Sequence, residues 1–426
     1  MAKILEIFRH PDTRKKILVI LGLLVFFRLL AAIPLPGVNL EALKGLLAAN
    51  NFFGILNIFS GGAIGKLSIA LLGVGPYITA TIILQLLTMV FPRLKEIYYE
   101  EGAAGRAKFN RLSRFITVPL AILQTYALLT FLVSQKVFPA FSLLDLSFWI
   151  NALTATAASM ILLWVGELID EQKLGNGVSL IIFAGIVAGL PMTLGNVFAQ
   201  ISEGLMRWDT LLIFAVIALV VIAGVVFVNQ GEHKVLVSYP KRIRGNRVYG
   251  GVESYLPIRV NQAGVIPIIF AMAMLSFPQM LGQIIVSFAP GIGTGINDAI
   301  TRFMSNQLAY GLIYFFLVFI FTYFYTAVVF DPKEISKNLQ QSGGFIPGTR
   351  PGEPTSKYIS TIVNKITLFG ALFLGLIAIL PIAVQSFVGH SFVIGGTALL
   401  IVVSVALDSW NQIDSQLKMR EYEVTE

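Results

Sequence analysis

The chain has 426 residues, of which 56% are hydrophobic and only 13% are charged. A soluble protein could not cover that much apolar surface with so few charges, so part of the solvent must be lipid. The sequence contains no cysteine, which excludes disulfides, thiolate metal sites and cysteine nucleophiles. In a membrane chain the net charge of +8 first reflects the Lys and Arg residues that hold loops in the cytoplasm.

Ten apolar stretches are long enough to cross a hydrocarbon core about 30 Å thick. The segment before them, residues 1–16, mixes basic and apolar residues at helical spacing, which predicts an interfacial helix and a retained first span instead of a cleaved signal. We therefore expect an all-α polytopic membrane protein. Its ten transmembrane helices are predicted at about 17–33, 71–90, 115–133, 148–168, 178–194, 211–228, 263–288, 311–330, 366–384 and 392–407.

The basic residues predict the orientation of the chain. With the N-terminus in the cytoplasm, 25 of the 31 Lys and Arg residues fall in cytoplasmic segments. The reverse orientation would place these charges outside, against the positive-inside rule. Both termini are therefore expected in the cytoplasm, together with two long loops at about 230–261 and 331–364.

Ten spans divide into two sets of five, and an odd number in each half gives the halves opposite orientations. The second span begins GVGP at 73–76, and the seventh, its counterpart, begins GVIP at 264–267. Paired Gly/Pro interruptions of this kind indicate an inverted repeat with its working site between the halves. We expect an N-terminal half at 1–198 and a C-terminal half at 199–426.

The stretch 52–67 is apolar, interrupted by glycine and too short to cross the membrane. Irregular backbone at membrane depth is tolerated only where it is buried in protein or lines a cavity, because lipid cannot satisfy its N–H and C=O groups. This stretch therefore predicts a short re-entrant segment beside a cavity.

The two long cytoplasmic loops differ in pattern. Residues 231–261 alternate apolar and basic residues around Gly245 and Asn246, which predicts a protruding β-hairpin. Residues 331–364 are rich in Gly and Pro and predict a second, turn-rich projection. These basic loops either bind partners or simply supply the positive charge that orients the chain.

The sequence offers no enzyme site. The run 61–66 resembles a phosphate-binding loop only superficially, because Ser60 and Leu67 occupy positions where that motif needs Gly and Ser or Thr. No two histidines stand at metal-ligand spacing on one helix, since they lie in separate regions at His10, His233 and His390. We therefore expect no cofactor, no metal and no enzymatic activity.

Ionisable residues are nearly absent from the predicted spans, which disfavours an ion-coupled or proton-coupled pump. The spans instead carry branched aliphatic residues near the glycine breaks and on the fifth and tenth helices. Ordinary helix packing accounts for such residues, and a hydrophobic constriction is the functional alternative. The residues concerned are Val74, Ile78, Ile182, Ile269 and Ile401.

Eight stretches resemble motifs of the bacterial SecY family, whose members form the centre of the Sec protein-conducting channel. The resemblance extends over about 15–408. The matching stretches are IPLPG at 33–37, FSGGA at 59–63, PYITATIILQLL at 76–87, GNG at 175–177, FAGIVAGLP at 183–191, VNQAGVIP at 260–267, GFIPGTRPGE at 344–353 and GGT at 395–397.

This resemblance implies four sets of functional residues. A pore ring would consist of Val74, Ile78, Ile182, Ile269 and Ile401. A lateral gate between the second and seventh spans would include the polar residues Gln85 and Asn261. A plug would comprise Asn57, Ile58, Phe59, Ser60, Gly61, Gly62, Ala63, Ile64, Gly65 and Lys66. Partner docking would use Lys241, Arg242, Arg244, Arg247 and Arg350.

The resemblance also implies a function: a channel that passes unfolded precursor proteins across the bacterial inner membrane and releases their apolar segments sideways into lipid. The implied partners are SecE, SecG, the motor ATPase SecA, the ribosome, signal-bearing precursor chains and the lipid bilayer, with SecDF as a further candidate. Two other hypotheses for the function remain open: an inverted-repeat secondary solute transporter and a membrane scaffold without a pore.

Overall fold

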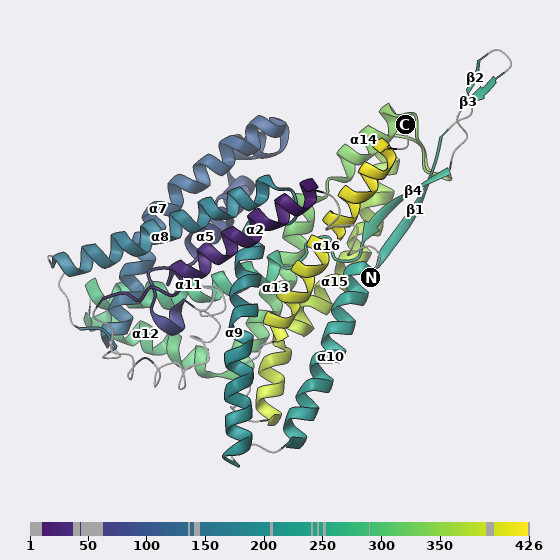
Figure 1. The fold of residues 1–426 in the computed structure, drawn as a ribbon. Coiled ribbons are helices and arrows are strands. Elements are labelled where there is room, and N and C mark those ends of the chain that lie inside the picture. Colours follow the sequence, from purple (N-terminus) through teal and green to yellow (C-terminus); the bar gives the residue numbers. More distant parts are fainter. Residues whose placement is uncertain are drawn as a thin grey trace.

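A computed structural model gives the structure of the protein. It describes residues 11–36, 43, 63–134, 137–139, 145–204, 208–239, 242–244, 247–249, 253–288, 290–388 and 396–424. Long helices dominate the described part of the chain, and a two-stranded ribbon projects from one end of the helical body (Figure 1).

Each of the ten predicted spans overlaps a helix. Within the described residues, six helices are long and apolar enough to cross a membrane, or up to seven if the helix pair Gly75–Thr88 and Pro92–Tyr98, bent by 114°, forms one span. The chain is therefore a multi-pass, all-helical membrane protein. The ten helices are α2 (Pro11–Leu30), α5 (Gly75–Val90), α7 (Gly102–Ser134), α8 (Leu146–Glu171), α9 (Gly177–Ser202), α10 (Trp208–Gln230), α11 (Ile266–Phe288), α13 (Gln307–Val329), α15 (Glu353–Val388) and α16 (Gly396–Val424).

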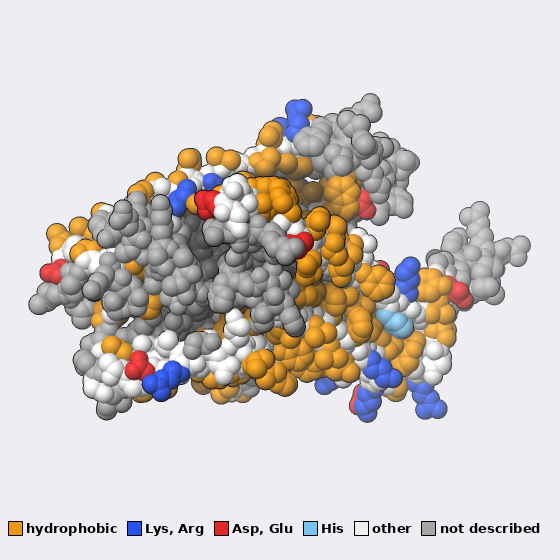
Figure 2. Space-filling model, turned by 90° about the horizontal axis from the view of Figure 1, so that it is seen from below, with side chains coloured by type: hydrophobic (Ala, Val, Ile, Leu, Met, Phe, Trp, Pro, Cys, Tyr) orange, Lys and Arg blue, Asp and Glu red, His pale blue; other side chains and the backbone are white. Residues whose placement is uncertain are grey.

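The surface of these helices suits a lipid environment. Hydrophobic side chains cover much of the face seen in Figure 2. Helix α10 exposes Leu212, Val216, Leu219, Val220 and Phe227. Such a broad exposed apolar surface is unusual for a soluble protein and matches the excess of hydrophobic residues in the composition.

Several helix starts follow directly from local sequence. The side chain of Asn176 accepts a hydrogen bond from the Ser179 amide at the start of α9, and Asn306 does the same for Leu308 and Ala309 at the start of α13. Such caps satisfy backbone N–H groups that have no partner within the helix. Helix boundaries at these places are therefore set by single polar residues.

Shorter elements connect the long helices. Among them, η1 (Ile64–Lys66) is a 3₁₀ turn, and α12 (Pro290–Ser305) lies between α11 and α13 and packs against both. The α5–α7 connection contains α6 (Pro92–Lys95) and the π-helical turn η2 (Glu96–Glu100). Phe91 and Pro92 separate α5 from α6, since a proline cannot continue the preceding helix.

The predicted hairpin is confirmed. Strands β1 (Glu232–Ser238) and β4 (Glu253–Arg259) pair antiparallel, and so do the short strands β2 (Arg242–Arg244) and β3 (Arg247–Tyr249) that flank the predicted turn. Figure 1 shows this ribbon extending away from the helices.

The second loop is more helical than its Gly and Pro content predicts. Helix α14 (Pro332–Gln341) is capped by Asp331, whose side chain accepts a hydrogen bond from the Lys333 amide, and α15 begins at Glu353. Turns occupy residues 342–352, between the two helices. The expectation of a turn-rich projection over 331–364 is therefore wrong outside those residues, because a capping Asp followed by Pro starts a helix.

The two loops pack together into what we call the hairpin unit, consisting of β1, β4, α14, residues 342–352 and the first turns of α15. Ser238 and Phe345 exchange backbone hydrogen bonds of 2.9 and 3.0 Å. The unit has its own small core, formed by Val235, Val237, Ile258, Ile346, Ile359 and Val363. Segments that are about a hundred residues apart thus form one packed structure.

Candidate functional site

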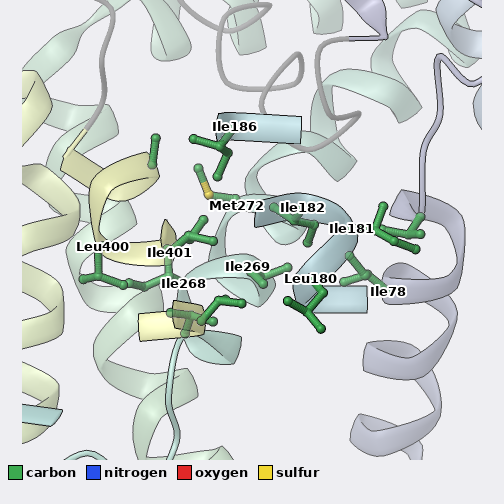
Figure 3. Close-up of a cluster of buried hydrophobic side chains, with 14 of the residues drawn as sticks. Ile78, Leu180, Ile181, Ile182, Ile186, Ile268, Ile269, Met272, Leu400 and Ile401 are labelled. Carbon is green, nitrogen blue, oxygen red and sulfur yellow. The ribbon is translucent and has the colours of Figure 1, made fainter. Parts of the chain in front are cut away.

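All five residues of the predicted pore ring are buried in one hydrophobic cluster, which we call the collar cluster. Val74 precedes α5, Ile78 lies on α5, Ile182 on α9, Ile269 on α11 and Ile401 on α16. Their exposed fractions range from 0% for Val74, Ile182 and Ile401 to 7% for Ile78. Figure 3 shows Ile78, Ile182, Ile269 and Ile401 lying together, contributed by four different helices.

The cluster contains further aliphatic residues that sequence reasoning missed. Ile186 lies four residues after Ile182, and Met272 lies three residues after Ile269, so each is on the same helix face as its ring residue. Ile181, Ile268 and Leu400 are also buried there (Figure 3). Helical spacing could have suggested Ile186 and Met272, whereas the other three adjoin ring residues and needed the tertiary structure.

The paired glycine breaks have the same backbone conformation. Gly73 has φ 54° and Gly264 has φ 60°, both in the left-handed region that a residue with a side chain rarely adopts. Each glycine is followed within three residues by the first residue of a helix, α5 or α11. The Gly73 carbonyl accepts a 2.7 Å hydrogen bond from Ser159 Oγ, and the Gly264 carbonyl accepts one of 3.3 Å from Asn261 Nδ2. These turns determine where the ring residues of α5 and α11 lie.

The described part of the predicted plug is its end. Asn57, Ile58, Phe59, Ser60, Gly61 and Gly62 lie outside the described residues. Ala63 is buried in the collar cluster, Ile64 is buried in a neighbouring core, and Lys66 is exposed.

The chain after η1 is held against the end of α2. The Leu35 amide donates to the Leu67 carbonyl at 2.8 Å, and the Ile69 amide donates to the Ile33 carbonyl at 2.9 Å. This pairing fixes the end of the plug segment at the collar cluster.

The two helices of the predicted lateral gate, α5 and α11, pack against each other, and both contact α7. Gln85 is buried on α5, and its Oε1 has no partner among the described residues. Asn261 lies between β4 and α11, and its Nδ2 donates to Asn229 Oδ1 on α10 at 2.7 Å. The Asn261 side chain thus joins the start of α11 to α10.

The predicted docking residues belong to the hairpin and the hairpin unit. Arg242 and Arg244 lie on β2 and Arg247 on β3, with Arg244 opposite Arg247, whereas Lys241 lies outside the described residues. Arg350 is exposed in the turn between α14 and α15. Its carbonyl accepts a 2.8 Å hydrogen bond from Thr355 Oγ1, which holds the turn in place.

The fold is that of a class of solved protein-conducting channels. A solved structure described as that of a protein conducting channel has a TM-score of 0.65, 18% identity, and covers 93% of this chain and 90% of its own. A structure concerning the plug domain of the SecY protein in the closed channel has a TM-score of 0.63, 18% identity, and covers 92% and 89%. Sec61 in the canine ribosome-channel complex has a TM-score of 0.62, 18% identity, and covers 93% and 90%.

Sequence comparison then identifies the family. The SecY family model matches residues 68–410. The protein translocase subunit SecY of Streptomyces coelicolor is 40% identical over 434 residues, covering 98% of this chain and 97% of its own. SecY of Aquifex aeolicus is 39% identical over 422 residues, with 98% and 97% covered. The chain belongs to the SecY family: it is a protein translocase subunit, not an enzyme.

Proposed function

We propose that this chain is the channel through which unfolded precursor proteins cross the membrane, with the collar cluster as its constriction. The observation that carries the proposal is the convergence of five aliphatic ring residues from α5, α9, α11 and α16 in one buried cluster. Two inverted halves, 1–198 and 199–426, with ten spans in total, would surround it. The matching φ values of Gly73 and Gly264 support that repeat.

An uncharged aliphatic collar suits a passage for polypeptides. Cargo of any sequence must pass without binding, so fixed charge or hydrogen-bonding groups in the constriction would hinder transport. Branched aliphatic side chains instead seal by contact with one another and by excluding water, which limits ion leak. The plug would add a second barrier, which the burial of Ala63 in the collar cluster supports.

The packing of α5 against α11 supports a lateral gate between these helices. If they separate, the constriction opens to lipid, and an apolar cargo segment partitions into the bilayer while a polar segment continues across. Gln85 and Asn261 would then be the polar residues near the opening, and the hydrogen bonds of Asn261 would favour the closed state.

Transport energy would come from partners, since the sequence has no nucleotide-binding motif. We propose that SecA and the ribosome bind the hairpin and Arg350, that SecE and SecG bind the helical body, and that SecDF assists. Sec61 and yeast Ssh1, which share this fold, have been solved in complexes with ribosomes, and this supports the ribosome as a partner. The chain would reside in the bacterial inner membrane, with both termini and the hairpin unit in the cytoplasm.

Reconstitution into liposomes with SecE, SecG, SecA and ATP tests the function. We expect a signal-bearing precursor to become protected from added protease, and we expect no protection when ATP or the signal segment is left out. Accumulation of a small solute without any protected precursor would contradict the channel and favour a solute transporter.

A further inference from the structure

Three polar side chains form a continuous hydrogen-bonded link next to the collar cluster. Asn261 Nδ2 donates to Asn229 Oδ1 at 2.7 Å, and Asn229 Nδ2 donates to Ser404 Oγ at 2.7 Å. Asn229 is at the end of α10, Asn261 precedes α11, and Ser404 lies on α16. We call these three residues the polar clasp, because their side chains join three elements.

Both ends of the clasp are buried and Asn229 between them is half-buried, so loss of its hydrogen bonds would be costly. Ser404 is 1% exposed and Asn261 is 8% exposed. A buried polar group that loses its partner bears a desolvation cost, so each member depends on the next. Asn229 uses both its oxygen and its nitrogen, so its amide has one orientation that satisfies both neighbours.

Each end of the clasp is close in sequence to a ring residue. Ser404 follows Ile401 by three residues on α16, so the two lie on the same helix face, one turn apart. Asn261 Nδ2 also donates to the carbonyl of Gly264, the left-handed residue of the turn from which α11 begins. The first hydrogen bonds of α11, from the amides of Ile268 and Ile269 to the Val265 carbonyl, follow at once.

The strand that leads into the clasp is itself anchored. The Val260 amide donates to the Gly231 carbonyl at 2.8 Å, which closes the base of the hairpin. A Cβ at Gly370 of α15 would lie 2.8 Å from the Val260 carbonyl oxygen, so the hairpin base and α15 are in close contact. Asn261 therefore projects from a fixed backbone.

We propose that Asn229, Asn261 and Ser404 are positioning residues, which hold Ile269 and Ile401 in the collar and thereby determine how tightly it seals. This inference rests on the proposed function of the collar. Without the clasp, α16 can shift against α10 and α11, and open arrangements of the collar become more populated. Buried hydrogen bonds between membrane helices have strengths that correspond to roughly a threefold to tenfold change in such an equilibrium.

Ion leak through the resting channel tests the clasp. Ser404→Ala removes one hydroxyl and leaves the backbone unchanged, and we expect it to raise the leak about threefold to tenfold while precursor transport persists. Thr322→Val is the matched control, because the Thr322 hydroxyl is also buried but bonds only within its own helix, to the Val318 carbonyl. Its leak should equal that of the wild type. An unchanged leak in Ser404→Ala would overturn the proposal.

A second variant and a distance measurement cover the case in which Ser404→Ala folds poorly. Asn229→Leu is close to Asn in size but carries neither the acceptor for Asn261 nor the donor to Ser404. Because the chain has no cysteine, Met274→Cys on α11 and Ala406→Cys on α16, both at exposed positions, can carry spin labels without background. We expect the distance distribution between the labels to broaden in Ser404→Ala and Asn229→Leu, and an unchanged distribution in both would refute the positioning role.

Leak and transport measurements on the same reconstituted liposomes distinguish an error in the clasp proposal from an error in the channel proposal. If Ile401→Ala leaks while both clasp variants match the wild type, the clasp proposal is wrong and the collar stands. If the wild type transports no precursor and Ile401→Ala does not leak, the proposed function fails, and the inference built on it fails as well.

Discussion

Ile401 has no exposed surface, and it shares its cluster with residues that serve only helix packing. Burial therefore does not distinguish a seal from a core. What distinguishes Ile401 is its place in the predicted ring, which Figure 3 shows beside Ile182 and Ile269, whereas Ile377 on α15 is buried in the same cluster but is not a predicted ring residue. A pair of matched truncations can separate these two roles.

Ile401→Ala should raise ion leak and also destabilise the protein. Truncating a buried Ile to Ala costs about 2 to 5 kcal/mol, and here the space left behind would lie in the constriction. Ile377→Ala should cost a similar amount but leave the leak unchanged. Ion flux from liposomes and thermal unfolding in detergent measure the two effects, and equal leak in both variants would contradict a localised seal.

Gly264→Ala should destabilise the start of α11 through its backbone alone. A Cβ at Gly264 would come no closer than 4.0 Å to Asp408 Oδ2, so space is available. The φ of 60° is the obstacle, and forcing Ala into the left-handed region costs about 1 to 2 kcal/mol. Gly22→Ala, inside α2 with nothing within 4 Å of its Cβ, is the control and should not lower the temperature of thermal unfolding.

At the scale of elements, short irregular segments are placed by the long helices around them. The turn η1 packs where backbone pairing joins residues 67–69 to residues 33–35. Ala63 then lies in the collar cluster, while Ile64 contributes to the core that also contains Leu129 and Phe148. The end of the plug segment thus lies at the boundary between two cores.

Deletion of residues 57–66 should raise the resting leak without abolishing precursor transport, because the collar remains and only the second barrier is lost. Electrical recordings from planar bilayers measure the leak, and protease protection measures transport in parallel. Lys66→Ala, a change at the exposed end of the same segment, should leave both unchanged. Unchanged conductance after the deletion would mean that the segment is not a barrier.

At the scale of the whole molecule, the hairpin unit connects the proposed docking residue Arg350 to the helical body. Its small core joins β1 and β4 to α14 and α15, and α15 in turn packs against α13 and α16. This unit holds the exposed Arg350. Reversing the charge of Arg350 would therefore change the surface charge offered to a partner without changing the packing of the unit.

Arg350→Glu should weaken SecA-driven transport by a larger factor than it changes stability. The side chain is exposed, and surface substitutions usually shift stability by no more than about 0.5 kcal/mol. Lys337→Glu makes a comparable charge reversal at an exposed position of α14 and is the matched control. Transport rate and thermal unfolding give the comparison; parallel losses in both, or equal transport defects in the two variants, would refute a specific docking role for Arg350.

The sequence by itself determined the features that depend on local pattern. Apolar runs predicted the ten helices, because only a helix satisfies its own backbone in lipid. Alternation around Gly245 and Asn246 predicted the hairpin, and the Gly and Pro residues near 73 and 264 predicted matched breaks that share a left-handed glycine. The ring residues came from the family resemblance, since many other Ile and Val residues fit the same local pattern.

Tertiary structure alone decided which distant residues meet. Apolar contacts have no direction, so no pattern showed that Val74 and Ile401 would share a cluster or that Ile186 and Met272 would join them. Nor did any local signal show that two loops would form one hairpin unit, or that Asn261 would bond to Asn229 and, through it, to Ser404. These contacts depend on how whole helices pack, and packing is a property of the assembled chain.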